Sequence, residues 1–299
     1  MNIITLTLNP AFDVHYTVDE FKPFAENYVS KISVQSGGKG INVSGALKSA
    51  GAENTAYVVV GERDFDSFSK GLDIKCKFFL TDGEVRRNIT VHTHGMPETR
   101  LSTDNFMLKE GVFDKVKCEL YSECVDDTVV VFSGRIPKGV GIDNVTDMLV
   151  SLREKGTKIV CDSNSLSLDG LLKIKPWLVK PNEHEVRKLH DGEFTDFALK
   201  LFERGIENVM VSLGERGIYY YGKNHCFTAR PPKIDCNSTI GAGDSAIAGF
   251  ISAYAKGADI ESSVKYAVAF GTASCLTQGT NPPVYEDIAS IFDKVEILY

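Results

Sequence analysis

The sequence predicts an α/β fold: a doubly wound, mostly parallel sheet with helices on both faces, plus a small β-sheet lid. The main sheet is indicated by short runs that are apolar throughout, separated by helical stretches and each followed by a polar or glycine turn. These runs cover residues 128–132, 158–161, 177–179 and 208–211. The lid is indicated by segments in which apolar and polar residues alternate, as in strands with one face in water. These segments cover residues 14–18, 28–34, 85–93 and 99–103.

The two patterns divide the chain into a main body and a discontinuous lid. We expect residues 1–13, 36–84 and 104–299 in the body, and residues 14–35 and 85–103 in the lid. One apolar face of the lid needs a cover, which a substrate cleft, a second copy of the chain or both could supply. The sequence therefore predicts a homodimer formed through the lid.

The N-terminal half of the body starts with a strand over residues 3–8. A glycine-rich turn then opens a helix that is expected to end at about residue 50, because Gly51 is a stop signal. A second strand over residues 57–60 is followed by a short helix near 65–71.

The C-terminal half of the body alternates strands and helices. A helix over residues 142–155 lies between the first two apolar runs, and residues 219–221 and 226–229 read as a hairpin. Three helices follow, over residues 243–256, 261–278 and 285–298. Because every apolar run stops at a polar or glycine turn, and ligands bind at the carboxyl ends of such strands, these turns are expected to face one crevice.

Composition excludes several classes of protein. The chain of 299 residues is 43% hydrophobic and 24% charged, as is ordinary for a soluble globular protein. Its formal net charge of −7 makes nucleic acid or an anionic membrane an unsuitable general partner. The N-terminus lacks the basic region of a signal peptide, and no apolar run has membrane-spanning length. The seven cysteines are scattered without C-x-x-C spacing, so we expect reduced thiols and a cytoplasmic protein.

Residues 237–250 carry the strongest chemical signal. Small and glycine residues are followed by apolar residues at helical spacing, so a helix starts there, and its first amides, from Gly241 to Gly243, have no intrahelical partner. With the helix dipole they form an anion site, and Asp244 stands beside it as a proton acceptor. The pairing indicates phosphoryl transfer. The alternative is that Asp244 only complements the dipole of an ordinary helix start.

Six spaced motifs give the chain a resemblance to the ribokinase/PfkB family of sugar kinases, and within it to the 1-phosphofructokinase and tagatose-6-phosphate kinase branch. They are Thr-Leu-Asn-Pro-Ala-Phe-Asp at 7–13, Gly-Gly-Lys-Gly-Ile-Asn-Val at 37–43, Ser-Gly with Ile-Pro at 133–137, Lys-Pro-Asn-Glu-His-Glu at 180–185, Val-Ser-Leu-Gly at 211–214 and Gly-Ala-Gly-Asp at 241–244. The resemblance implies a ribokinase-like fold over nearly the whole chain. It also implies transfer of the γ-phosphoryl group of ATP to a sugar hydroxyl.

The resemblance assigns roles to individual residues. The catalytic base would be Asp244, beside an anion hole formed by the amides of Gly241, Ala242 and Gly243. The phosphorylated sugar would be held by Asp13, Gly38, Lys39, Asn42, Arg86 and Asn88. ATP would be bound by Lys180, Asn182, Ser212, Gly214 and Gly217. Asn182 and Glu185 match an Asn-x-x-Glu element that is linked through water to the Mg²⁺ of MgATP.

Three departures from the branch bear on the choice of ligand. The chain has Arg135 where the branch usually has serine, and Thr90 where it usually has lysine. Arg135 either replaces the missing phosphate contact or marks a changed ligand. Asn237 precedes Ser238 and Thr239, where the branch has Asn-Thr, so the dependence on a monovalent cation seen in some relatives is not assured.

Other interpretations stay open at this point. Asp13 could cap a turn, and Asn182 and Glu185 could simply start a helix after a proline. The histidines at 92, 94, 184 and 190 lack metal-ligand spacing and are read as structural. The preferred activity is phosphorylation of fructose 1-phosphate to fructose 1,6-bisphosphate. The alternatives are tagatose 6-phosphate or fructose 6-phosphate as acceptor, and a non-catalytic sugar-phosphate sensor.

Overall fold

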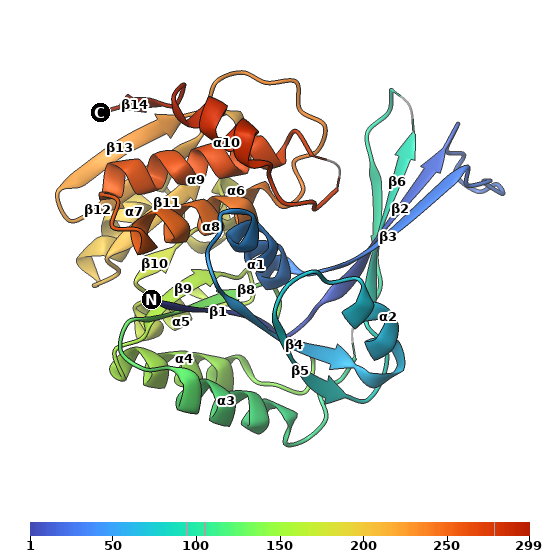
Figure 1. Cartoon of the computed structure of the whole chain (residues 1–299), viewed down its shortest axis with the longest axis horizontal. Coiled ribbons are helices and arrows are strands. Elements are labelled where there is room, and N and C mark those ends of the chain that lie inside the picture. Colours follow the sequence, from blue (N-terminus) through green and yellow to red (C-terminus); the bar gives the residue numbers. More distant parts are fainter. Residues whose placement is uncertain (94, 105, 278) are drawn as a thin grey trace.

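The computed structural model describes residues 1–93, 95–104, 106–277 and 279–299 and contains one large and one small sheet (Figure 1). The large sheet has ten strands in the order β14-β13-β12-β11-β10-β9-β8-β1-β4-β5. All neighbours from β11 to β5 pair in parallel, whereas β12, β13 and β14 are added antiparallel at one edge. The strands are β1 Asn2–Thr7, β4 Thr55–Gly61, β5 Cys76–Thr81, β8 Thr128–Ser133, β9 Lys158–Asp162, β10 Leu178–Val179, β11 Asn208–Ser212, β12 Ile218–Gly222, β13 His225–Arg230 and β14 Glu296–Leu298.

Helices cover both faces of this sheet, as the continuous apolar runs predict. Side chains point alternately to the two faces, so Val130 and Phe132 join one core while their neighbours Val129 and Val131 join the other. The first core is covered by α3 Val112–Glu123, α4 Ile142–Glu154, α5 Leu168–Ile174, α6 Glu183–Leu189 and α7 Phe194–Glu203. The second is covered by α1 Lys39–Ser49, α8 Ala242–Ala255, α9 Ile260–Ser274 and α10 Tyr285–Phe292.

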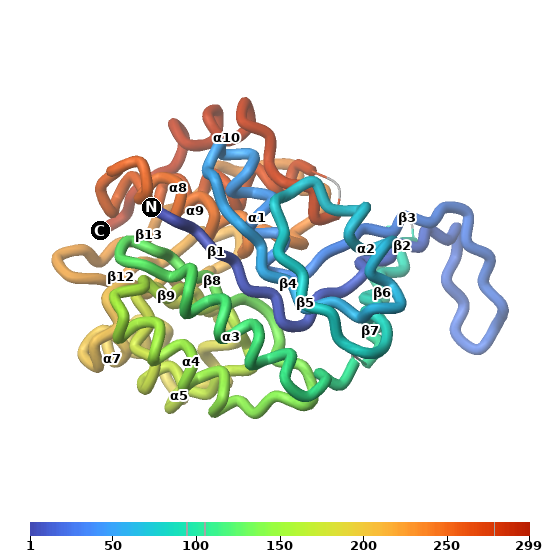
Figure 2. Tube along the Cα trace, turned by 60° about the horizontal axis from the view of Figure 1, so that its bottom comes forward, coloured from blue at the N-terminus to red at the C-terminus, as the bar shows by residue number. Residues whose placement is uncertain are grey.

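The small sheet has the strand order β3-β2-β6-β7 and projects from the body (Figure 2). Its strands are β2 Ala11–Val18, β3 Lys31–Gly37, β6 Arg86–Thr93 and β7 Thr99–Ser102, and we call these four strands the lid. Phe12 and Val14 lie on one face and pack against a third core that includes Phe68 of α2 Phe65–Lys70. The boundaries at which body and lid meet stay a prediction.

The two faces of the lid differ in chemistry. Strand pairing places Val34, Val14, Ile89 and Leu101 in one row on the apolar face. Val14 is buried, but Val34 and Leu101 at the two edges are 56% and 55% exposed. The opposite face carries the polar residues of β2, β3 and β6. The apolar face therefore covers the body only in part.

Several element boundaries predicted from the sequence are wrong. The helix expected over residues 285–298 ends at Phe292, and its last residues form β14, which pairs with β13. Strand β3 begins at Lys31 rather than at residue 28, and β2 begins already at Ala11. Asp13 therefore lies inside a lid strand and not at the end of the first strand. Strand β5 and helix α3 were not predicted.

Among the described residues, no helix is long and apolar enough to cross a membrane. The seven cysteines are all free thiols.

Candidate active site

The carboxyl ends of four parallel strands meet the N-termini of two helices at one edge of the large sheet. Strands β8, β9, β10 and β11 end there at Ser133, Asp162, Val179 and Ser212. This is the edge at which open α/β sheets bind ligands. Helices α1 and α8 begin over the same edge, so their unpaired amides and positive dipole ends are available for anions.

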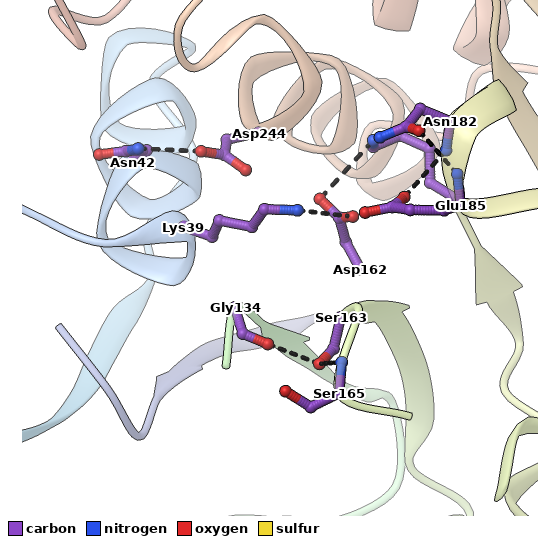
Figure 3. Close-up of polar contacts among 10 residues, drawn as sticks. Lys39, Asn42, Gly134, Asp162, Ser163, Ser165, Asn182, Glu185 and Asp244 are labelled. Carbon is purple, nitrogen blue, oxygen red and sulfur yellow. Dashed lines mark hydrogen bonds and ion pairs between the residues drawn. The ribbon is translucent and has the colours of Figure 1, made fainter. Parts of the chain in front are cut away.

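Two lysines share one buried carboxylate at this edge. Lys39 Nζ lies 3.1 Å from Asp162 Oδ1, and Lys180 Nζ lies 3.6 Å from Asp162 Oδ2 (Figure 3). The Asp162 and Lys180 side chains are only 2% and 5% exposed. Burial favours a protonated Asp162, but the Lys180 and Lys39 charges outweigh it and lower its pKa. The site therefore holds an ionised carboxylate that fixes both lysines.

Lys39 stays cationic for the same reason. Burial opposes its charge, yet the carboxylates of Asp162, Asp244 and Glu185 raise its pKa. A lysine that remains charged at the N-terminus of helix α1 can neutralise a phosphate group.

Asp244 lies in the first turn of α8 and is buried. Its Oδ2 accepts a hydrogen bond of 2.9 Å from Asn42 Nδ2 of α1 (Figure 3). Burial, followed by the negative charge of Asp162, raises the pKa of Asp244 to about 7, although Lys39, Asn42 and Lys180 oppose the shift. A carboxylate with this pKa can take a proton near neutral pH.

The turn before α8 brings backbone amides and Lys180 together. Gly241 has a φ of 81°, a left-handed conformation that glycine adopts without strain. A Cβ on Gly243 would lie 3.0 Å from Lys180 Nζ, so the ammonium group sits directly against the start of the helix. The amide of Ala242 makes only a long hydrogen bond of 3.4 Å, to Thr239 O. The turn thus offers amides and a cation to one anion.

The polar face of the lid supplies a second cluster. Asn88 Nδ2 donates to Asp13 Oδ1 at 2.9 Å, and Arg86 Nη1 donates to Asn88 Oδ1 at 2.7 Å. Arg86 Nε also donates to Asn9 Oδ1 at 3.1 Å. Burial raises the pKa of Asp13, although the Asn88 hydrogen bond opposes it. A Cβ on Gly37 would collide with Asp13 Oδ2, so any other residue there would displace this carboxylate.

The turn at the start of α1 joins the two clusters. Gly37 lies against Asp13 on the lid side, while Lys39 reaches Asp162 and Asn42 reaches Asp244 on the body side. Gly38, with a φ of 140°, lets this turn pass close to the end of β1. A ligand placed over the turn would meet both clusters.

Arg86 and Arg135 lie close enough to repel each other. Burial and then the charge of Arg135 lower the pKa of Arg86. Among the described residues, neither guanidinium has a carboxylate within ion-pair distance. Thr90 is buried in β6 opposite His15 of β2, so the position where the branch has lysine carries no charge here.

The residues expected to bind nucleotide lie at and after the carboxyl ends of β10 and β11. Asn182 and Glu185 form a capping box at the start of α6, in which each side chain accepts a 3.0 Å hydrogen bond from the other residue's amide. The Ser212 amide donates to Pro181 O at 2.9 Å and so ties β11 to the same turn. The alternative reading of Asn182 and Glu185 as a helix start is therefore confirmed, and it leaves one carboxylate oxygen of Glu185 outside the capping box.

The two glycines after β11 differ. A Cβ on Gly217 would lie 2.0 Å from Ala229 O, so packing against β13 explains this residue. Gly214, with a φ of 62°, has no atom within 4 Å of its Cβ position and faces open space. Of the two, Gly214 is the better placed to admit a ligand.

Sequence reasoning missed Asp162 as a site residue and also missed Asn9. Both follow an apolar strand, which was the available signal. Asn9 belongs to the motif at 7–13 but was given no role there, and Asp162 belongs to none of the motifs that carried the family resemblance. The histidines form no metal site among the described residues, where no three metal-ligating side chains cluster. His190 packs on Phe197. His94 lies outside the described residues.

The geometry fits a known family. The model of the pfkB family carbohydrate kinases matches residues 7–287. The chain belongs to the pfkB family. As a pfkB protein it is a carbohydrate kinase, and its phosphoryl donor in this family is ATP.

Individual pfkB relatives match along the whole chain. The 1-phosphofructokinase of Borreliella burgdorferi is 35% identical over 99% of this chain and 98% of its own length. The tagatose-6-phosphate kinase of Staphylococcus epidermidis is 30% identical over 99% of both chains.

Solved structures agree. Phosphofructokinase-2 of Escherichia coli, in complex with substrates and products, superposes with a TM-score of 0.91 at 26% identity over 98% of this chain and 99% of that one. A nucleoside kinase of Methanocaldococcus jannaschii, an archaeal member of the ribokinase family, superposes with a TM-score of 0.72 at 20% identity over 98% of this chain and 99% of that one. The predicted ribokinase-like fold and family are thereby confirmed, and the ATP-dependent phosphorylation of a sugar phosphate agrees with these relatives.

Proposed function

We propose that the chain transfers the γ-phosphoryl group of ATP to a hydroxyl of fructose 1-phosphate and so forms fructose 1,6-bisphosphate. The observation that carries this proposal is the pair Arg86 and Arg135, two neighbouring guanidinium groups without a carboxylate partner in the described part of the chain. Such a pair suits a phosphate that is already present on the acceptor. The names of full-length relatives support the same acceptor class.

Asp244 is proposed as the general base. Because its pKa is raised to about 7 and Asn42 orients one of its oxygens, it can accept the proton of an acceptor hydroxyl held above it. The oxygen freed of that proton then attacks the γ-phosphorus, and the bond to the ADP oxygen breaks. Asp13 and Asn88 are proposed to hold the sugar hydroxyls, since carboxylate and amide groups both accept hydrogen bonds from them.

Lys39, Lys180 and the amides of Gly241, Ala242 and Gly243 are proposed to stabilise the charge that develops on the transferred group. Phosphoryl transfer depends mainly on such positioning and electrostatic stabilisation. Asp162 keeps both lysines in place before the ligands bind. Once phosphates arrive, each ammonium group would gain a second anionic partner.

The residues present fit a magnesium ion that arrives with the nucleotide. Glu185 lines a cavity of about 60 Å³ together with Asp162 and Lys180, and oxygen donors are the ligands Mg²⁺ prefers. Asn182 uses its oxygen in the capping box, so we propose that Asn182 and Glu185 hold the ion through water. The ion supplies neutralisation of phosphate charge. Ser212, Gly214 and Gly217 are proposed to shape the nucleotide end of the site.

Arg135 is proposed to take over the phosphate contact that the branch assigns to the lysine replaced by Thr90. A tagatose 6-phosphate or fructose 6-phosphate acceptor is the second candidate, which the full-length tagatose-6-phosphate kinase relative favours. An assay of ADP release with MgATP and each phosphosugar, alongside the free hexoses, separates these acceptors. A preference for fructose 1-phosphate is expected. Equal rates with free fructose would contradict the proposal.

A homodimer formed through the lid is proposed from its apolar face. Ile32 and Val34 on one edge strand and Leu101 on the other are 62%, 56% and 55% exposed on the same face, and exposed apolar side chains of this kind mark association sites. Light scattering at micromolar concentration is expected to give twice the mass of 32.8 kDa. A monomer would contradict the proposal. The cytoplasmic location stays a prediction.

A further inference from the structure

The segment between α9 and α10 contacts both the lid and the turn that precedes Asp244. On the lid side, the Thr280 hydroxyl and backbone amide donate to Gln35 Oε1 at 3.3 and 3.5 Å. Gln35 Nε2 donates to Asn281 Oδ1 at 3.0 Å. Gln35 therefore uses both ends of its amide on one short segment of the body.

Glycine makes this contact possible. Gly279 has a φ of 61°, and a Cβ there would lie 2.8 Å from Gln35 Oε1. Any other residue would push the Gln35 amide away and strain the backbone. The turn is braced from within by Thr277, whose hydroxyl donates to Asn281 O at 2.8 Å.

The same segment lies against the anion-hole turn. A Cβ on Gly241 would lie 3.9 Å from Thr280 Cα. One turn earlier, the Asn237 amide donates to Cys275 O at 2.8 Å, and its side chain donates to Leu276 O at 2.7 Å. The loop that carries the anion hole is thus attached to this segment at two places.

Gln35 also lies next to the residues that are proposed to hold the acceptor, although its own side chain bonds only to the body segment. It is the direct strand partner of Asp13, whose other strand partner is Asn88, so all three lie in one row on the polar face of the lid. Movement of the lid over an acceptor would therefore move Gln35 together with Asp13.

A histidine pair holds a second lid residue against the same turn. His15 Nδ1 lies 2.9 Å from His92 Nε2, and His92 Nδ1 lies 3.3 Å from Glu98 Oε1. This chain of contacts fixes the His15 ring, whose Nε2 lies 3.6 Å from the Cβ position of Gly279.

We propose that Gln35 is a positioning residue which couples acceptor binding on the lid to the anion-hole turn through Gly279, Thr280 and Asn281. The proposal rests on the phosphosugar kinase activity proposed above. The Gln35 contacts hold this segment against Gly241, so the amides that receive the γ-phosphate are set when a bound acceptor keeps the lid in this position. Binding of acceptor and nucleotide is then mutually favourable.

Titration calorimetry on the full chain tests the coupling. A non-hydrolysable ATP analogue with Mg²⁺ is titrated into the protein with and without fructose 1-phosphate. In the unaltered protein the acceptor is expected to tighten analogue binding at least about fivefold, which is the lower range of ordinary coupling between sites. In Gln35→Ala this gain is expected to fall below about twofold, while the affinity for each ligand alone changes little.

Matched variants distinguish a loss of coupling between the two ligands from a general disturbance of the lid structure. Ser33 lies two positions before Gln35 on the same face and is exposed, so Ser33→Ala should keep the full gain. Thr280→Val removes only the hydroxyl contact and should lose part of the gain. Full coupling in Gln35→Ala, or no coupling in the unaltered protein despite acceptor binding, would overturn the proposal. Absence of binding by any phosphosugar would instead refute the proposed function.

Discussion

The body and the lid both present cations to the crevice, but they hold them differently. In the body, Lys39 and Lys180 share the buried carboxylate of Asp162. In the lid cluster, Arg86 is held by the neutral amides of Asn9 and Asn88 and is close to the exposed Arg135. A cation with a counter-charge is fixed in every state, whereas a cation held only by amides keeps its charge for a ligand. This difference agrees with the proposal that the body cations serve the phosphoryl group being transferred and the lid cation serves a phosphate that stays on the acceptor.

The largest effect is expected at the body end, from Asp244→Asn. The substitution keeps the size of the side chain but removes the proton acceptor, so kcat should fall by about 10³, within the range typical of general-base catalysis. The Michaelis constant for ATP should change little. Steady-state kinetics checks this.

The matched control is Asp259→Asn. Asp259 also begins a helix, where it accepts a 2.7 Å hydrogen bond from the Ser262 amide. Asparagine is an equally good cap, so activity should be unaffected. A similar loss in both variants would mean that Asp244 only stabilises its helix.

The second effect concerns the lid end. Arg86→Ala removes the charged hydrogen bonds that Arg86 is proposed to donate to the acceptor phosphate, and each such bond contributes about 1.5–3 kcal/mol. The Michaelis constant for fructose 1-phosphate is therefore expected to rise by roughly 10- to 100-fold, with that for ATP unchanged. Initial rates over both substrate concentrations check this.

Arg87→Ala is the control for the lid. Arg87 is the next residue after Arg86 in β6, so its side chain lies on the opposite face of the lid, over the Phe12 ring and near Glu84. Its loss should leave the acceptor constant within about twofold, since exposed ion pairs contribute only about 0–1 kcal/mol. An equal rise of the Michaelis constant for fructose 1-phosphate in Arg86→Ala and Arg87→Ala would mean that the polar face of the lid is not the face that binds the acceptor.

A smaller effect is expected from Arg135→Ser, which restores the residue usual in the branch. Because Arg135 is exposed, solvent screens its charge, and the acceptor constant should rise by no more than about fivefold. An unchanged constant, measured in the same assay, would show that Arg135 does not replace the lysine missing at Thr90.

The smallest change is a shift of pH dependence. Asp244 must be ionised to act as a base, and its pKa is raised to about 7 by burial and by the Asp162 charge. The rate should therefore fall as pH drops through about 7. Asn42→Ala removes a hydrogen bond that favours the ionised form, so this limb should move to higher pH. A shift to lower pH in the profile of kcat would contradict the assignment.

Sequence patterns were sufficient for the buried central strands of the body, which have an unmistakable composition, but they missed the partly exposed edge strand β5. Val129, Val130, Val131 and Phe132 are all buried, as a strand covered on both sides requires. The pattern failed at β14, where Glu296–Leu298 continues the apolar spacing of α10 but pairs with β13. Pairing at a sheet edge depends on a distant strand, which local periodicity does not report.

The candidate site divides in the same way. Motifs located Asp244 and Lys39, because their neighbours are glycines with a local signature, and the family resemblance assigned Arg86. Asp162 was missed because its role comes from Lys39 and Lys180, which reach it from other elements. The proximity of Arg86 and Arg135 likewise depends on how the lid sits over the body.

The most direct test removes the phosphate from the acceptor and the guanidinium of Arg86 from the protein, separately and together. The ratio of kcat/KM for fructose 1-phosphate to that for free fructose is measured in the unaltered protein and in Arg86→Ala. We expect a strong preference for the phosphorylated sugar that falls by roughly 10- to 100-fold in the variant, while activity on free fructose changes little. A preference that survives the loss of Arg86 unchanged would contradict the claim that the lid reserves this cation for the acceptor phosphate.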